Sequence, residues 1–191
     1  MGMFYYQCEQ TSKSTGCTAY GVCGKDPETA ALQDLLVHVT KGVSQYANAA
    51  RQLGIKDADL DHFVIEALFT TVTNVNFDAT AVAAQIRKGV ELRNRAKGLY
   101  EKACQNAGRA PEQLQGPAAF AVSDSQDEMV RQGEKVGIEG KLAHFGNDVG
   151  GLQELIMYGL KGTAAYADHA WVLGVEDDDI YAFFHDTLDL L

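Results

Sequence analysis

The residues of this chain most suited to chemistry lie near its start, in the stretch MFYYQCEQTSKSTGCTAYGVCGK (3–25). This stretch holds three of the four cysteines, spaced Cys8-x8-Cys17-x5-Cys23, in a segment rich in glycine, serine and threonine. Iron–sulfur clusters are held by thiolates, usually four of them, on adaptable backbone of this kind. A cysteine in place of Tyr5 would complete the spacing C-x2-C-x8-C-x5-C. The pattern therefore predicts an iron–sulfur site with one thiolate replaced.

Two other interpretations of these thiols stay open. Zinc also accepts thiolates, although zinc sites usually use two closely spaced pairs, and the nearest histidine, His38, lies outside the segment. The thiols could equally be buried or reactive cysteines without a metal. The fourth cysteine, Cys104, lies within a helical pattern, which favours a small core residue over a missing ligand.

Composition narrows the classes of partner. The chain has 191 residues, 46% hydrophobic and 22% charged, with a net charge of −10 and no basic cluster, so we expect no nucleic-acid partner. No apolar run approaches the roughly 20 residues that span a bilayer, and the start lacks the pattern of a signal peptide. We therefore expect no membrane partner and a cytoplasmic location. The acidic surface suits a basic redox partner or serves solubility alone.

The apolar residues after position 27 recur with helical spacing, and few segments alternate as strands do. Asp26 and Pro27 supply an N-cap and a first-turn proline, and Gly54 supplies a stop. The sequence thus predicts an all-α fold. Helices are expected over residues 27–53, 57–76, 78–107, 123–135, 152–173 and 177–191, with a loop punctuated by glycines between 136 and 151.

The chain also repeats itself at an offset of 120 residues. Residues 32–68 align without a gap on residues 152–188, and 14 of the 37 positions are identical. We infer two related helical-bundle units, of which the second stops after two helices and leaves an apolar seam. The apolar ending DTLDLL suggests that the chain is a piece of a longer protein. The predicted organisation is a cysteine-rich cluster loop (3–26), a three-helix bundle (27–107), a connecting segment (108–151) and an incomplete second bundle (152–191).

The cysteine stretch, together with TNVNFD (73–78) and YGLKGTAAYADHAWVLG (158–174), resembles the N-terminal region of the hybrid-cluster proteins, also called prismane proteins or hydroxylamine reductases. The resemblance runs from Met3 to Leu191. It implies an all-helical first domain of two three-helix bundles and a [4Fe–4S] cluster ligated by Cys8, Cys17 and Cys23, with Tyr5 at the position of the family's first cysteine. It also implies that the catalytic hybrid cluster is ligated from later domains, so no catalytic residue is assigned in this chain.

Tyr5 departs from the family pattern. A phenolate is a hard oxygen donor and a poor replacement for a thiolate ligand of an iron–sulfur cluster. Tyr5 is therefore a doubtful ligand, and loss of the iron at that corner would give a [3Fe–4S] form.

These observations favour a cluster-binding electron-transfer module of a parent oxidoreductase, acting with a redox partner or with the remaining domains of a larger enzyme. A first alternative is a helical scaffold whose cluster site is vestigial. A second is an interaction subunit, or a homodimer through the incomplete second bundle. The second alternative predicts an exposed apolar patch over Leu155, Met157, Leu160, Phe183 and Phe184.

Overall fold

The computed structural model describes residues 3–6, 8 and 11–191, and within them the all-α prediction is confirmed. The only extended pairing among these residues is an isolated antiparallel bridge between Tyr5 and Cys17. None of the helices described is long and apolar enough to cross a membrane. The helices are α1 (Pro27–Arg51), α2 (Ala58–Thr70), α3 (Ala79–Asn106), α4 (Gln126–Val136), α5 (Ile138–Val172) and α6 (Asp178–Leu190), with short 3-10 turns η1 (Ser12–Ser14) and η2 (Gly116–Ala119).

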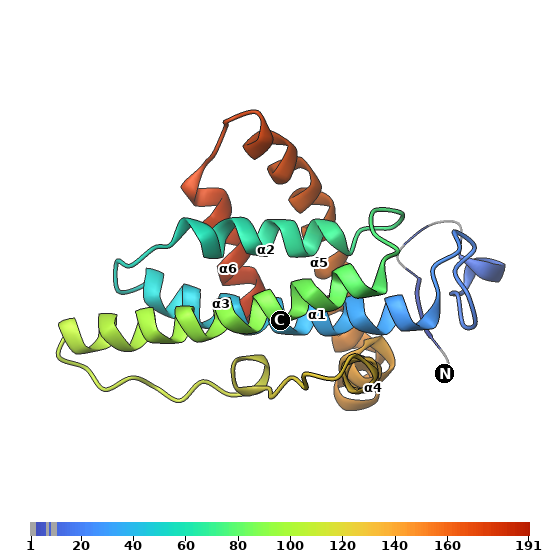
Figure 1. The fold of residues 1–191 in the computed structure, drawn as a ribbon, viewed down its shortest axis with the longest axis horizontal. Helices are drawn as coiled ribbons and strands as arrows, with labels where there is room; N and C mark the ends of the chain where they lie inside the picture. Colours follow the sequence, from blue (N-terminus) through green and yellow to red (C-terminus); the bar gives the residue numbers. More distant parts are fainter. Residues whose placement is uncertain (1–2, 7, 9–10) are drawn as a thin grey trace.

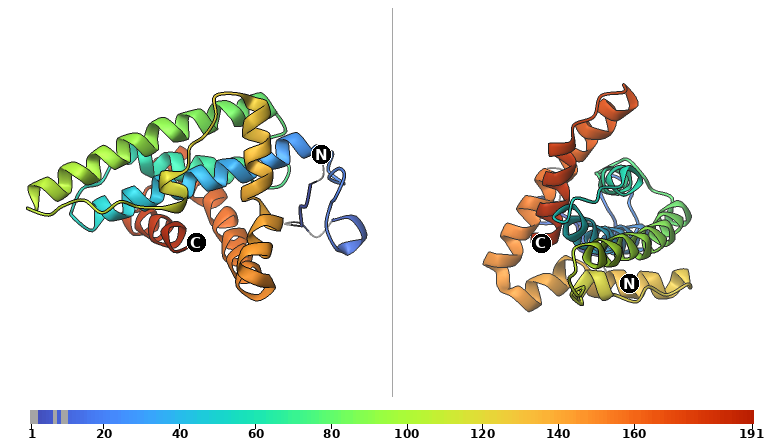
Figure 2. Two further views of the ribbon diagram at one scale, coloured as in Figure 1. Left: turned by 90° about the horizontal axis from the view of Figure 1, so that it is seen from below. Right: turned by 90° about the vertical axis from the view of Figure 1, so that its left-hand side faces the viewer.

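Helix α1 lies at the centre of the fold. The Asp26 side chain accepts a hydrogen bond from the Thr29 amide (2.7 Å) and caps the helix as predicted. Its apolar stripe is fully buried, mainly against α3, and Figure 1 shows α1, α2 and α3 running side by side. Helix α4 instead crosses α1 (Figure 2), and this crossing needs a glycine. A Cβ on Gly133 would lie 1.9 Å from the carbonyl oxygen of Ala31.

The predicted loop between residues 136 and 151 is wrong. This stretch is helical and belongs to α5, apart from a break at Gly146, whose φ of 79° interrupts the helix. The other glycines allow close packing instead of ending the helix, because a Cβ on Gly150 would lie 2.9 Å from the Leu142 side chain. Helix α2 also ends earlier than predicted, at Thr70, and a turn with Asn74 at a φ of 66° follows it.

The boundaries of one pair of helices, α2 and α6, agree with the offset of 120 residues, whereas α5 begins earlier than the offset from α1 would place it. Helices α2 and α6 begin and end at positions 120 apart, and Asp57 and Asp177 cap them in the same way. Gly54 and Gly174, which precede them, have φ values of 80° and 76°. Helix α5 packs on α2 and α6 packs on α1, so buried residues of both pairs belong to one hydrophobic core.

The expected apolar patch forms only in part. Leu155 and Phe183 are 65% and 54% exposed, as the prediction requires. Met157, Leu160 and Phe184 are at most 3% exposed, because they face the core shared with α1 and α2.

Candidate functional site

The cysteine segment lies beside the N-terminal end of α1 (Figure 1) and is held by backbone pairing. The Tyr5 amide donates to the Cys17 carbonyl (3.1 Å), and the Cys17 amide donates to the Tyr5 carbonyl (2.7 Å). A tight turn around Cys23 follows, in which the Gly21 amide donates to the Lys25 carbonyl (2.8 Å) and Gly24 takes a φ of 95°. The fold therefore places Tyr5 directly opposite Cys17.

The three predicted thiol ligands differ in exposure. Cys17 is 2% exposed, Cys8 is half-buried and Cys23 is exposed; all three are free. Among the described residues, no group of three histidine, cysteine, aspartate or glutamate side chains converges closely enough to hold a metal ion. The segment thus gathers the thiols at one end of α1 without bringing them to a single point.

Tyr5 is buried, and its hydroxyl group is hydrogen-bonded. Its Oη lies 3.0 Å from Thr73 Oγ1, in the turn after α2. Burial raises the pKa of Tyr5 to about 12, and the nearby Cys8, Asp34 and Cys23 act in the same direction. The phenol is therefore neutral at physiological pH, which disfavours a phenolate ligand at this position.

Lys25 is the site residue that the sequence analysis missed. Its side chain is 1% exposed, its Nζ donates to Gln33 Oε1 (2.6 Å), and the same Nζ lies 4.2 Å from the Tyr5 ring centroid. Burial lowers its pKa, and Cys23, Asp34 and Cys8 oppose that shift. Within the described chain, no carboxylate lies at ion-pair distance from this ammonium. The sequence does contain one signal for this residue, because Lys25 is the only lysine or arginine between Lys13 and Lys41 and it lies two residues after Cys23.

A cleft of about 680 Å³ opens beside Cys8. One wall carries Tyr5, Cys8 and Thr73, and the other is a turn of α5 with Tyr158 and Lys161. Helix α5, which follows the cysteine segment by more than a hundred residues, therefore forms part of the candidate site.

Comparison with known proteins connects this geometry to a family. A family model described as the Prismane/CO dehydrogenase family matches residues 3–191. The chain belongs to this family. The resemblance to the prismane (hybrid-cluster) proteins stated from the sequence is thereby confirmed.

Similar proteins carry the name hydroxylamine reductase. The protein of Geobacter metallireducens is 47% identical over 190 residues, which cover 98% of this chain and 34% of that protein. The protein of Geobacter sulfurreducens is 48% identical with the same coverage, and that of Acidithiobacillus ferrooxidans is 48% identical over 99% of this chain and 35% of that protein. The chain thus spans about a third of the length of these relatives.

The side chains of this Prismane-family segment fit a thiolate-bound group in chemistry. Three free thiols share one segment, and two of them, together with Asp34, act electrostatically on the buried ammonium of Lys25, which has no carboxylate at ion-pair distance in the described chain. Holding one metal group would require the thiols to move closer together than they lie here. Tyr5 does not fit, since its hydroxyl is bound to Thr73.

Cys104 lies apart from this site. It is 2% exposed in α3, within the main hydrophobic core, as predicted for a small core residue.

Proposed function

We propose that the chain is an iron–sulfur electron-transfer module corresponding to the N-terminal third of a hydroxylamine reductase, with Cys8, Cys17 and Cys23 as ligands. Its membership of the Prismane family and the three free thiols at one end of α1 support this proposal. The reduction of hydroxylamine, suggested by the names of the relatives, would be an activity of a whole protein of this kind. We propose a cytoplasmic location and a redox partner for it.

The observation that carries the proposal is the buried ammonium of Lys25. Burying a charge is strongly unfavourable unless an opposite charge or a hydrogen-bond network compensates it. The neutral amide of Gln33 and the face of the Tyr5 ring offer only partial compensation. Deprotonated Cys23 and Cys8 would add negative charge to that of Asp34, the carboxyl that also acts on this ammonium. A lysine placed in this way is expected beside metal-bound thiolates.

A bound cluster would accept and release single electrons. The residues of this chain would hold it and shield it from water. The bridge to Tyr5 would fix Cys17, and the hydrogen bond between Tyr5 and Thr73 would hold the segment against the turn after α2. Because Tyr5 supplies no thiolate, we propose a [4Fe–4S] cluster with one iron bound by a non-thiolate ligand, or a [3Fe–4S] cluster lacking that iron.

The test is an assay of iron and acid-labile sulfide, combined with EPR, on protein purified without oxygen. We expect iron and sulfide in the parent, retained in Cys104→Ser and lost or sharply reduced in Cys17→Ser. A Tyr5→Cys variant should raise the iron content or stabilise the four-iron form. Zinc in place of iron, or folded protein without any metal after reconstitution, would refute the proposal.

A helical scaffold is the second candidate, favoured by a separate observation. Buried residues from each of the six α-helices pack into a contiguous core that contains none of the described residues of the cysteine segment. The thiols also lie apart in the present structure. This candidate predicts that a Cys8→Ser, Cys17→Ser, Cys23→Ser triple variant unfolds thermally at the same temperature as the parent under anaerobic conditions. A large fall in that temperature would exclude the scaffold.

A further inference from the structure

A chain of hydrogen bonds joins Lys25 of the cysteine segment to the turn between α2 and α3. Lys25 Nζ donates to Gln33 Oε1 (2.6 Å), and Gln33 Nε2 donates in turn to the backbone oxygen of Asn76 (2.9 Å). Asn76 belongs to the stretch TNVNFD (73–78), to which the proposed function gives no role. Figure 1 shows this turn at the same end of the molecule as the cysteine segment. The turn therefore holds Lys25 through one intervening side chain of α1.

The two hydrogen bonds fix the orientation of the Gln33 amide, which is buried at 3% exposure. A glutamine amide has an acceptor oxygen at one end and a donor nitrogen at the other. The reversed amide would place its NH2 group against the Lys25 ammonium and its oxygen against the Asn76 carbonyl oxygen, and both contacts are repulsive. Gln33 thus presents a neutral acceptor to Lys25. It holds the ammonium in place without cancelling its charge.

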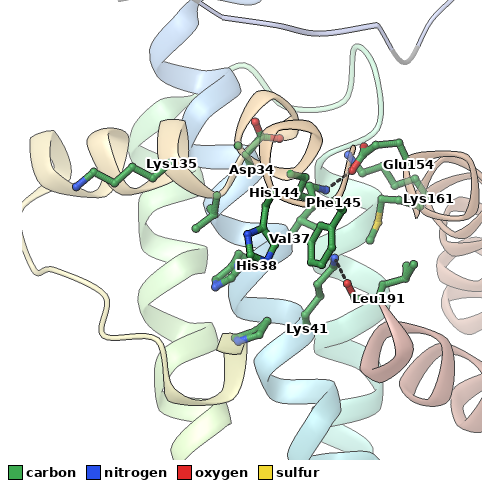
Figure 3. A pocket seen from close by; sticks show the side chains of 15 residues that line it. Asp34, Val37, His38, Lys41, Lys135, His144, Phe145, Glu154, Lys161 and Leu191 are labelled. Carbon is green, nitrogen blue, oxygen red and sulfur yellow. Dashed lines mark hydrogen bonds and ion pairs between the residues drawn. The ribbon is translucent and has the colours of Figure 1, made fainter. Parts of the chain in front are cut away.

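The carboxyl group that acts on Lys25 belongs to Asp34, and it interacts mainly with other groups. Asp34 lines a cavity between α1 and α5 together with Glu154 and Lys161 (Figure 3). Burial raises the pKa of Asp34 to about 6, and Lys161 and Lys141 oppose that shift more strongly than Lys25 does. No ion pair joins Asp34 to Lys25 in the part of the chain that the structure describes. The charge of Lys25 is therefore only partly offset.

A tight turn places Lys25 beside one of the proposed ligands. A Cβ on Gly21 would lie 2.9 Å from Cys23 Sγ and 3.2 Å from Lys25 Cβ, so the thiol and the base of the lysine side chain contact the same glycine. The Tyr5 ring lies 4.2 Å from Lys25 Nζ, and the hydrogen bond between Tyr5 and Thr73 holds that ring. The ammonium is thus fixed within the segment that carries the thiols.

We propose that the Lys25 ammonium raises the reduction potential of the cluster, and that Gln33 is the positioning residue that keeps this charge in place. This inference rests on the proposed function. Reduction adds one electron, supplied by the redox partner or by dithionite in a titration; no bond to Lys25 forms or breaks, and Lys25 keeps its protons. A buried positive charge stabilises the added negative charge, because the attraction is strong in surroundings of low dielectric constant and is little screened by salt. Charge near the cluster is one of the factors that set such potentials.

The test is an anaerobic titration with dithionite near neutral pH, followed by EPR, on protein whose iron and acid-labile sulfide have been measured. Lys25→Met removes the charge and keeps the length of the side chain. We expect the equilibrium constant for reduction to fall by about tenfold or more, a midpoint potential lower by about 59 mV or more. Lys13→Met is the matched control, because Lys13 is exposed in the same segment and its charge is screened. The midpoint potential of this control should equal that of the parent.

Gln33→Glu is a second variant, and it decides the outcome if Lys25→Met fails to fold or to bind a cluster. It keeps the shape of the side chain and places a carboxylate against Lys25 Nζ, so the midpoint potential should again fall. Circular dichroism verifies that the helices of each variant are intact.

The outcomes separate this inference from the proposed function. A parent protein without a cluster would refute the proposed function, and this inference with it. A parent with a cluster whose midpoint potential is unchanged in Lys25→Met or Gln33→Glu overturns this inference alone. An equal fall in Lys13→Met also overturns it, because the potential would then follow the net charge of the chain and not the buried ammonium.

Discussion

The helix pairs α1–α2 and α5–α6 share a sequence pattern, but the equivalent apolar residues of the two pairs are buried to different extents. Leu32 is fully buried, whereas Leu152, 120 positions later, is 62% exposed. Tyr46 and Tyr166 differ even more, at 5% and 81% exposure. The cause is a neighbour, because α3 packs along α1, while no helix of the described chain covers the corresponding face of α5. An amphipathic pattern therefore specifies which face of a helix is apolar, but not what will cover it.

The largest expected difference in stability is between alanine variants of Phe63 and Phe183, which lie at positions 120 apart. Phe63 is 1% exposed and packs beside Gly89, whereas Phe183 is 54% exposed. Phe63→Ala should lower the free energy of unfolding by about 4 kcal/mol through the cavity that it leaves. Phe183→Ala should cost less than about 1 kcal/mol. Urea unfolding measures both, and equal losses would show that the face of α6 is covered in solution.

A buried polar network joins the two pairs, and the sequence analysis did not identify it. His185 of α6 is fully buried, with Nε2 2.7 Å from Asp61 Oδ1 and Nδ1 3.2 Å from Ser44 Oγ. Asp61 also binds Arg51 (2.6 Å). Burial acts to raise the pKa of Asp61, but the hydrogen bonds with His185 and Arg51 outweigh it and hold the pKa below its usual range.

This network predicts a loss of stability in acid. A carboxyl whose pKa is lower in the folded state stabilises the protein above its unfolded pKa, about 3.9. That contribution disappears as the pH falls through the folded pKa. Asp61→Asn should lower the free energy of unfolding by about 3 kcal/mol near neutral pH. Its stability should also fall less steeply below about pH 4 than that of the parent. Unfolding curves with parallel pH dependence would contradict this role.

Replacing two equivalent glycines, Gly42 and Gly162, by alanine should change the stability of the protein in opposite directions. A Cβ on Gly42 would lie 2.4 Å from the Pro117 carbonyl oxygen, whereas a Cβ on Gly162 would meet no atom within 4 Å. Gly42→Ala should therefore destabilise the protein by about 1–3 kcal/mol through overpacking. Gly162→Ala should stabilise it by about 0.5–1 kcal/mol through helix propensity. Thermal or urea unfolding tests both signs, and destabilisation by Gly162→Ala would indicate a neighbour on α5.

The smallest expected difference in stability is between variants of the N-cap residues of α2 and α6. Asp57 and Asp177 accept hydrogen bonds from the amides of Asp59 (3.0 Å) and Asp179 (2.9 Å). Replacing either by alanine should cost about 1 kcal/mol. Similar losses in urea unfolding would show that the pairs are alike locally and differ only in packing. A loss confined to Asp57→Ala would mean that its contacts with Arg95 matter more than the cap.

Local signals in the sequence predicted the parts of the fold that local chemistry decides. Asp26 and Pro27 correctly located the start of α1, and Asp78 located that of α3. The stretch 136–151 was mispredicted because a glycine is equally suited to a chain break, as at Gly146, and to a close contact, as at Gly150. Only the packed structure distinguishes these uses.

For the candidate site too, local sequence signals were predictive, and the contacts made by packing were not. Spacing alone singled out Cys8, Cys17 and Cys23, whose ligand role stays a prediction. The partners of Lys25 were not visible, because Gln33 and Tyr5 approach it only after the segment folds against α1. Tyr158 and Lys161 of α5 line the cleft beside Cys8, a proximity that no single stretch of sequence shows.

The separation of the cysteine segment from the main core has a consequence for order of assembly. Met3, Tyr5, Cys17 and Ala30 form a small hydrophobic cluster of their own, apart from the large core around α1. Such a unit can open by local unfolding while the helices stay folded. Hydrogen exchange at the Tyr5 and Cys17 amides should then be much faster than at Leu35 in α1. A chain built this way could fold first and bind the proposed cluster afterwards.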